Sequence, residues 1–458
     1  MATFRSPAIT TSDELIFGQA PRPVTTRSGM VIGGGTVYPE LNFTLATMPV
    51  NEATFGDIRS QYDKIAREAL ARAADLSAPG VVIEFETLPA MTDNPAWAAD
   101  LCKVLLEAMA DAQAETGLLS ALRITPNDNR QTTGQDASQR SRHLDNMLNV
   151  FDLCAAAGAE FLSVESTGGK ELHDQAILSG DIRKAIYALS VIATADMEML
   201  WDRIVDIANR HDAIPAGDTA CAFGNTSMVL ADRKMLPRVF AAVDRAVTAI
   251  RSLVAHECGA IGPGKDCGYE NPILKAITGM PMSMEGKSAA CAHLSAIGNL
   301  PMAMADLWSN ESVQNIKLLG GMAPTVSMEQ LIYDCRLLNC ASASGQTAAL
   351  QLRDWLVAGD ATLDPQAFIL APDNVIELSR TITAAPDHYR ACRDVAIKAV
   401  DLLSNAHDDG RMELDSRELP WLERMDQTLK SMPDERTDFI EQMQAELTDE
   451  YIVTDVNA

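Results

Sequence analysis

Short apolar runs alternate with longer helix-like segments through the middle of the chain. Six runs rich in β-branched or apolar residues are spaced as strands, at 81–85, 119–124, 161–164, 213–215, 252–256 and 281–284. Between them, apolar residues recur at helical spacing in four segments, at 146–157, 182–209, 235–250 and 289–307. Alternation of this kind predicts βα units around a parallel sheet.

The two ends of the chain follow other patterns. Residues 1–79 hold a Gly33-Gly34-Gly35 turn and an amphipathic stretch at 55–74, which predict an N-terminal extension. Strand patterns end after residue 373, and residues 374–458 are expected to form acidic amphipathic helices. Residues 80–373 would then form the catalytic domain. A (β/α)8 TIM barrel suits it better than a doubly wound sheet, because no glycine-rich dinucleotide motif follows the first strand.

Composition narrows the range of functions. The 458 residues include 47% hydrophobic and 22% charged residues, which is typical of a globular protein and excludes a mostly disordered or fibrous chain. Lys and Arg total 37 against 63 Asp and Glu, giving a formal net charge of -26. A surface of that sign repels a phosphate backbone, so no nucleic-acid partner is expected.

No membrane segment is expected, and the N-terminus lacks the pattern of a signal peptide, so we predict a cytoplasmic protein. The nine cysteines are scattered and form no CxxC pair, so reduced thiols are expected.

Three of the expected strands are followed by polar clusters that a strand does not require. Glu165 lies in the first cluster, Cys221 in the second, and Cys267 in a glycine-rich third. The carboxyl ends of barrel strands converge on one funnel, so these side chains would meet there. A carboxylate and two thiolates can bind zinc and leave a fourth position open, as in catalytic zinc sites. The alternative from residue types alone is that the cysteines are buried and bind no metal.

Other polar residues flank these three positions. Asp218, Glu257 and Asp266 are candidates for proton delivery or ligand orientation, together with Lys265 and Glu270. Loop capping and surface ion pairs are the alternative for each. His256 is expected to be structural, because strand alternation would point it away from its neighbours.

Several blocks of sequence resemble the zinc-containing subunit of the methanol:corrinoid methyltransferases. They are SVESTGGKELHD (163–174), AGDTACAFGNTSM (216–228), RSLVAHECGAIGPGKDCGYENP (251–272), ITGMPMSMEGK (277–287) and LWSNESVQ (307–314). The likeness extends over nearly the whole chain. It implies a TIM barrel and zinc ligands at Glu165, Cys221 and Cys267.

The resemblance also implies an activity and partners. Zinc would activate methanol, and the methyl group would pass to the cobalt(I) of a corrinoid, a cobalamin-type cofactor carried by a separate protein. A homodimer within that complex is expected as well. Three alternatives stay open: a methyl ether, thioether or halide as the donor, a zinc hydrolase or lyase, and a metal-free scaffold.

Overall fold

The computed structural model describes residues 4–45, 48–130, 137–287, 296–313 and 317–447. Its centre is a parallel seven-stranded sheet with the order β7-β6-β5-β4-β3-β9-β8. The strands are β3 (Tyr38–Leu45), β4 (Val81–Glu86), β5 (Ser120–Thr125), β6 (Phe161–Val164), β7 (Ile214–Asp218), β8 (Ser283–Glu285) and β9 (Leu307–Val313).

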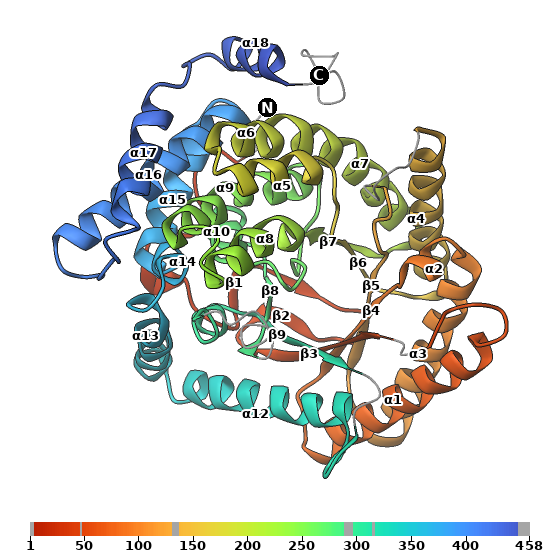
Figure 1. Cartoon of the computed structure of the whole chain (residues 1–458). Coiled ribbons are helices and arrows are strands. Elements are labelled where there is room, and N and C mark those ends of the chain that lie inside the picture. The colour runs from red at the N-terminus through yellow and green to blue at the C-terminus, as the bar shows by residue number, and fades with distance from the viewer. Residues whose placement is uncertain (1–3, 46–47, 131–136, 288–295, 314–316, 448–458) are drawn as a thin grey trace.

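An irregular eighth segment joins the two edges of this sheet. The backbone N–H of Ile261 donates to the carbonyl of Pro215 in β7 at 2.8 Å, and Gly264 pairs with Met282, directly before β8. Residues 261–266 therefore occupy the position of the missing strand. The expected (β/α)8 TIM barrel is confirmed, and Figure 1 shows it with the helices arranged around the strands.

Helices form the outer ring of the barrel. Those that follow the strands are α1 (Phe55–Asp75), α2 (Pro89–Thr92), α3 (Pro95–Thr116), α4 (Ala137–Ala157), α5 (Lys170–Ser179), α6 (Ile182–Tyr187), α7 (Ala193–His211), α8 (Cys221–Asp232), α9 (Arg238–Glu257), α10 (Asn271–Thr278) and α12 (Ala323–Ala343). A π-helical turn, Ala188–Ile192, joins α6 to α7.

Two of the expected elements are wrong. The strand expected at 252–256 is the last part of α9, in which every residue from Val239 to His256 is buried. A helix covered on all sides carries no polar stripe, so its sequence resembles a buried strand. The described part of the helix expected at 289–307 holds only a 3₁₀ turn, Pro301–Ala303, before β9 begins at Leu307, and residues 289–295 lie outside the described part of the chain.

An N-terminal hairpin closes the bottom of the barrel. Strands β1 (Gln19–Thr25) and β2 (Val31–Gly34) pair with each other, and their apolar residues pack on the first residues of the barrel strands. This small core consists of Val24, Met30, Ile32, Tyr38, Val82, Ala121, Phe161, Ala216 and Leu307. The next strand, β3, lies between β4 and β9, so the barrel begins well before residue 80.

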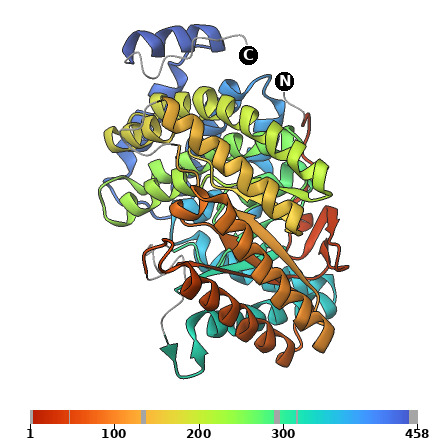
Figure 2. The ribbon, with the colours of Figure 1, turned by 90° about the vertical axis from the view of Figure 1, so that its right-hand side faces the viewer.

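The helices after the barrel cover one side of it. They are α13 (Gln346–Ala361), α14 (Pro365–Ile369), α15 (Pro372–Ala384), α16 (His388–Asp408), α17 (Leu419–Lys430) and α18 (Arg436–Glu446). Figure 2 shows α18 set apart from the body, and Phe439 anchors it by stacking on Tyr389 with ring centres 4.3 Å apart. Among the described residues, no helix is long and apolar enough to cross a membrane.

Candidate metal centre at the barrel mouth

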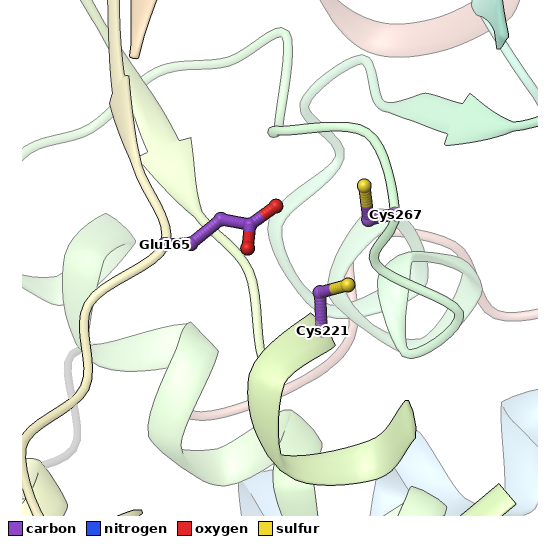
Figure 3. Close-up of side chains that lie close together, drawn as sticks. All are labelled: Glu165, Cys221 and Cys267. Atoms are coloured by element: carbon purple, nitrogen blue, oxygen red, sulfur yellow. The ribbon is translucent and has the colours of Figure 1, made fainter. Parts of the chain in front are cut away.

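Three side chains from three successive βα units meet at the carboxyl end of the barrel. Glu165 directly follows β6, Cys221 is the first residue of α8 after β7, and Cys267 follows the closing segment. One ligand atom from each lies within 4.8 Å of the other two. Figure 3 shows the carboxylate and both sulfurs around one shared space. The predicted convergence of these three residues is therefore present in the structure.

Buried polar contacts hold the loops that carry these residues. Asp218 is buried, and its Oδ1 accepts hydrogen bonds from the backbone N–H of Ser166 at 3.2 Å and from Arg251 at 3.0 Å. Its Oδ2 accepts from the Trp201 indole at 2.9 Å. Because Ser166 follows Glu165, Asp218 ties the loop after β6 to the end of β7.

The third loop is held in the same way. Asn271 donates from Nδ2 to the carbonyls of Lys265 at 2.7 Å and Ser283 at 2.6 Å. Cys267 has a φ of 53°, a left-handed conformation that is uncommon for a residue with a side chain. Glu270 accepts from the backbone N–H of Ala220 at 2.7 Å and so joins this loop to the start of α8.

A buried lysine and three acids adjoin the ligands. The Lys265 ammonium lies 2.9 Å from Glu84, 2.8 Å from Glu86 and in contact with Asp266, and it is 3.6 Å from Oε1 of Glu165. The carboxylates of Glu84, Glu86 and Asp266 also lie close enough together to hold a cation. Lys265 places one positive charge among these three carboxylates and offsets part of their negative charge.

Burial and neighbouring groups change the pKa values of the three candidate ligands. Burial raises the pKa of Glu165 to about 7, although Lys265 opposes the shift. The hydrogen bond with Cys267 lowers the pKa of Cys221, but burial and the charge of Glu165 outweigh it and raise the pKa to about 12. The hydrogen bond with Cys221 and burial raise the pKa of the Cys267 thiol. A bound cation would therefore displace protons from these groups.

The donor set fits zinc. Two thiolates and one carboxylate are ligands that zinc accepts, and three protein ligands from distant parts of the chain leave a coordination position free. A cavity of about 120 Å³ adjoins Glu165. Threonine and asparagine side chains contribute to its wall, which consists of Glu86, Thr87, Thr125, Pro126, Asn127, Asp128, Glu165, Thr167 and Ala222. A small polar molecule could reach a metal from this cavity.

The other candidates occupy different places. Asp266 lies beside the site, where its Oδ2 accepts from Ser309 at 2.6 Å and the ammonium of Lys265 helps to lower its pKa against the effect of burial. Glu257 is not brought to this group: at the end of α9 its Oε2 lies 2.8 Å from Nε2 of His388 in α16. His256 is structural, with Nδ1 donating to the carbonyl of Ala260 at 3.0 Å.

Three further acids lie at this mouth that the sequence patterns did not predict. Glu84 and Glu86 alternate along β4, and Glu285 ends β8, where burial raises its pKa well above the usual range. Acidic residues two apart in an otherwise apolar strand were the available signal, because such residues share one face.

Comparisons with known proteins agree with this geometry. The family model described as "Methanol-cobalamin methyltransferase B subunit" matches residues 1–457. The methanol–corrinoid protein co-methyltransferase of Methanosarcina barkeri (strain Fusaro / DSM 804) is 37% identical over 442 residues, which is 96% of this chain and 95% of the relative.

A solved structure resembles the whole chain. A chain of the methanol:cobalamin methyltransferase complex MtaBC from Methanosarcina barkeri superposes with a TM-score of 0.92 at 35% identity, over 99% of this chain and 98% of that one. These matches span the barrel, its N-terminal hairpin and the C-terminal helices together. The chain therefore belongs to the methanol-cobalamin methyltransferase B subunit family.

Proposed function

We propose that this protein is a zinc-dependent methyltransferase that moves the methyl group of methanol to the cobalt(I) of a corrinoid carried by a separate protein. The observation that carries this proposal is the meeting of Glu165, Cys221 and Cys267 beside a small cavity at the barrel mouth. The names of the relatives support methanol as the donor and a corrinoid as the acceptor.

The reaction exchanges one bond for another. The electron pair of cobalt(I) forms a bond to the methyl carbon while the C–O bond breaks, and the oxygen leaves as hydroxide that takes a proton to become water. Hydroxide is a poor leaving group without neutralisation. Zinc, held by Glu165, Cys221 and Cys267, would supply the Lewis acidity that stabilises negative charge on the departing oxygen.

The residues of the chain bind and orient the small donor. The cavity of about 120 Å³ brings the hydroxyl-bearing side chains of Thr87, Thr125 and Thr167 to the side of Glu165. Its size limits how many solvent molecules can accompany the donor, which strengthens electrostatic interactions within the site. Lys265 offsets part of the negative charge around the ligands, and Asp218 fixes the loop that presents Glu165.

Removal of each thiol tests the proposal. We expect Cys221→Ala and Cys267→Ala to lose bound zinc and to stop conversion of cobalt(I) to methyl-cobalt(III) with methanol, while circular dichroism shows a folded barrel. Cys392→Ala is the control, because it removes a free thiol that is buried in α16 rather than placed at the barrel mouth. Full zinc content and activity in either ligand variant would contradict the proposal.

The same assay separates the alternative functions. A higher rate with methoxylated aromatic donors than with methanol would assign the chemistry to another methyl donor. A purified, zinc-repleted protein with substantially less than one zinc per chain would favour a metal-free scaffold. The cavity of about 120 Å³ beside Glu165 suits a small donor such as methanol better than a methoxylated aromatic one.

We also propose that the protein acts as a homodimer that binds its corrinoid protein. The support is family membership, together with large apolar side chains exposed on α12 and α13.

A further inference from the structure

The amide of Asn225 lies against one of the two ligand sulfurs. Asn225 is one helical turn after Cys221 in α8, and side chains four residues apart share one face of a helix. Its Nδ2 lies 2.9 Å from Sγ of Cys221, within hydrogen-bonding distance. The helix that supplies the ligand therefore also supplies a donor to that ligand.

The amide has no competing role in the described structure. Its Oδ1 is buried and has no hydrogen-bond partner among the described residues, so the contact with sulfur is what orients the side chain. Thr219 contacts the backbone of Cys221 rather than its sulfur, because the N–H of Cys221 donates to Oγ1 of Thr219 at 3.1 Å. The side-chain amide of Asn225 therefore donates directly to the sulfur of Cys221.

The second ligand sulfur has a different environment. The nearest nitrogen recorded for Cys267 is the Lys265 ammonium, 4.0 Å from Sγ. That ammonium is held mainly by Glu84, Glu86 and Asp266 at shorter distances. The two thiolates are therefore not equivalent: one has a short neutral donor, and the other has a more distant charge.

A hydrogen bond to a thiolate changes what the sulfur gives to a metal. An N–H donor draws electron density toward itself, so the sulfur donates less charge and the metal remains a stronger Lewis acid. This matters here because two thiolates and a carboxylate carry three negative charges against the two of zinc. Donors around ligating atoms also fix the rotamer of the ligand.

We propose that Asn225 is a positioning residue that holds the Cys221 thiolate and limits its charge donation, which keeps the metal acidic enough to activate the alcohol. This inference rests on the proposed function, because it concerns the same metal centre. Asn225 does not need to touch the substrate for this role. Its effect passes through the sulfur of Cys221.

Replacing zinc with cobalt(II) makes the charge donation of the Cys221 sulfur measurable by absorption spectroscopy, without substrate or partner protein. The thiolate-to-cobalt charge-transfer band reports the energy of the sulfur lone pairs. Asn225→Leu removes the donor at similar volume and Asn225→Ala removes it without added bulk, so both should shift the band to longer wavelength while still binding cobalt. Asn225→His, which restores an N–H donor, should return the band toward its original position. Thr226→Val is the matched control, because Thr226 is the next residue of α8 and donates to the carbonyl of Ala222 instead.

Activity follows as a second measurement. In the zinc protein, Asn225→Leu and Asn225→Ala should reduce kcat for methyl transfer about tenfold or more, the effect usual for residues that support metal ligands. An unchanged band in both variants, with cobalt bound, would overturn the role of Asn225 even if methyl transfer is confirmed. A shifted band in a protein that does not methylate cobalt(I) would support Asn225 and reject the proposed function. Absence of any thiolate band in the unsubstituted protein would overturn both.

Discussion

Asp218 accepts hydrogen bonds from four donors: the backbone N–H groups of Ser166 and Thr219, the Arg251 guanidinium and the Trp201 indole. Asp218→Asn keeps the shape but removes the charge and turns one acceptor into a donor. Breaking a buried charge pair costs about 3–5 kcal/mol. We expect a loss of about that size in the free energy of unfolding, measured by urea denaturation, with weaker zinc binding because the Glu165 loop is released.

Glu257→Gln is the comparison for that experiment, because Glu257 pairs with His388 on the outer side of α9. Gln keeps an oxygen acceptor for His388 and loses only the charge, so the free energy of unfolding should fall by about 1 kcal/mol or less. Zinc content and methyl transfer should stay at the level of the unsubstituted protein. Loss of zinc from a folded Glu257→Gln protein would show that this residue supports the metal centre after all.

His256 gives a pH-dependent prediction. Burial lowers its pKa from 6.5 to about 4, so the unfolded chain takes up a proton at a higher pH than the folded protein does. Stability therefore falls as the pH drops from about 6.5 to about 4, by about 3 kcal/mol from this group. The difference in unfolding free energy between the original protein and His256→Gln, measured across this range, should shrink by that amount. A difference independent of pH would contradict burial of a neutral imidazole.

The meeting of the three candidate ligands could be predicted from the sequence, but most of their supporting contacts could not. Glu165, Cys221 and Cys267 each follow a strand or its equivalent, and barrel geometry brings such positions together. Asn225 and Glu285 do not stand at such positions after a strand, and their contacts depend on distances that only the folded chain defines. Glu257 directly precedes the loop of Cys267 but belongs to a helix whose end faces away.

At the level of elements, the polar interior of the barrel explains which strands were missed. β3 carries Glu40 and Asn42, and β9 carries Ser309, all buried, so neither strand shows the continuous apolar run expected in a parallel sheet. Arg123 pairs with Glu40 inside the barrel at 2.6 Å. The strand at 161–164 is mostly apolar and buried throughout, and it was predicted with the bounds that the structure shows.

The N-terminal hairpin makes a separate contribution to stability. Ile32 is fully buried in the small core that closes the bottom of the barrel. Ile32→Ala should lower the free energy of unfolding by about 2–5 kcal/mol, the usual cost of truncating a buried aliphatic side chain. Zinc per folded chain should not change, because the ligands lie at the opposite ends of the strands. Val31→Ala is the control, since Val31 is exposed in the same strand and its loss should cost little.

At the scale of the whole molecule, three regions occupy different sides of the barrel. The metal centre lies at the carboxyl ends of the strands, the hairpin closes their amino ends, and the helices from α13 onward extend around the outside (Figures 1 and 2). The net charge of -26 keeps the surface acidic. Large apolar side chains nevertheless remain exposed on α12 and α13, where Tyr333, Leu337 and Trp355 are 52%, 54% and 66% exposed.

The proposed homodimer predicts that these side chains become covered. Light scattering after size exclusion should give twice the 49.4 kDa of one chain, and Trp355→Glu combined with Leu337→Glu should return the mass to that of one chain. A charge placed in an apolar interface is costly to desolvate, whereas it costs little on a solvated surface. Leu178→Glu is the matched control, because Leu178 in α5 is 68% exposed but lies on another helix. A single-chain mass for the unsubstituted protein at micromolar concentration would reject the homodimer, and dissociation by Leu178→Glu alone would move the interface to α5.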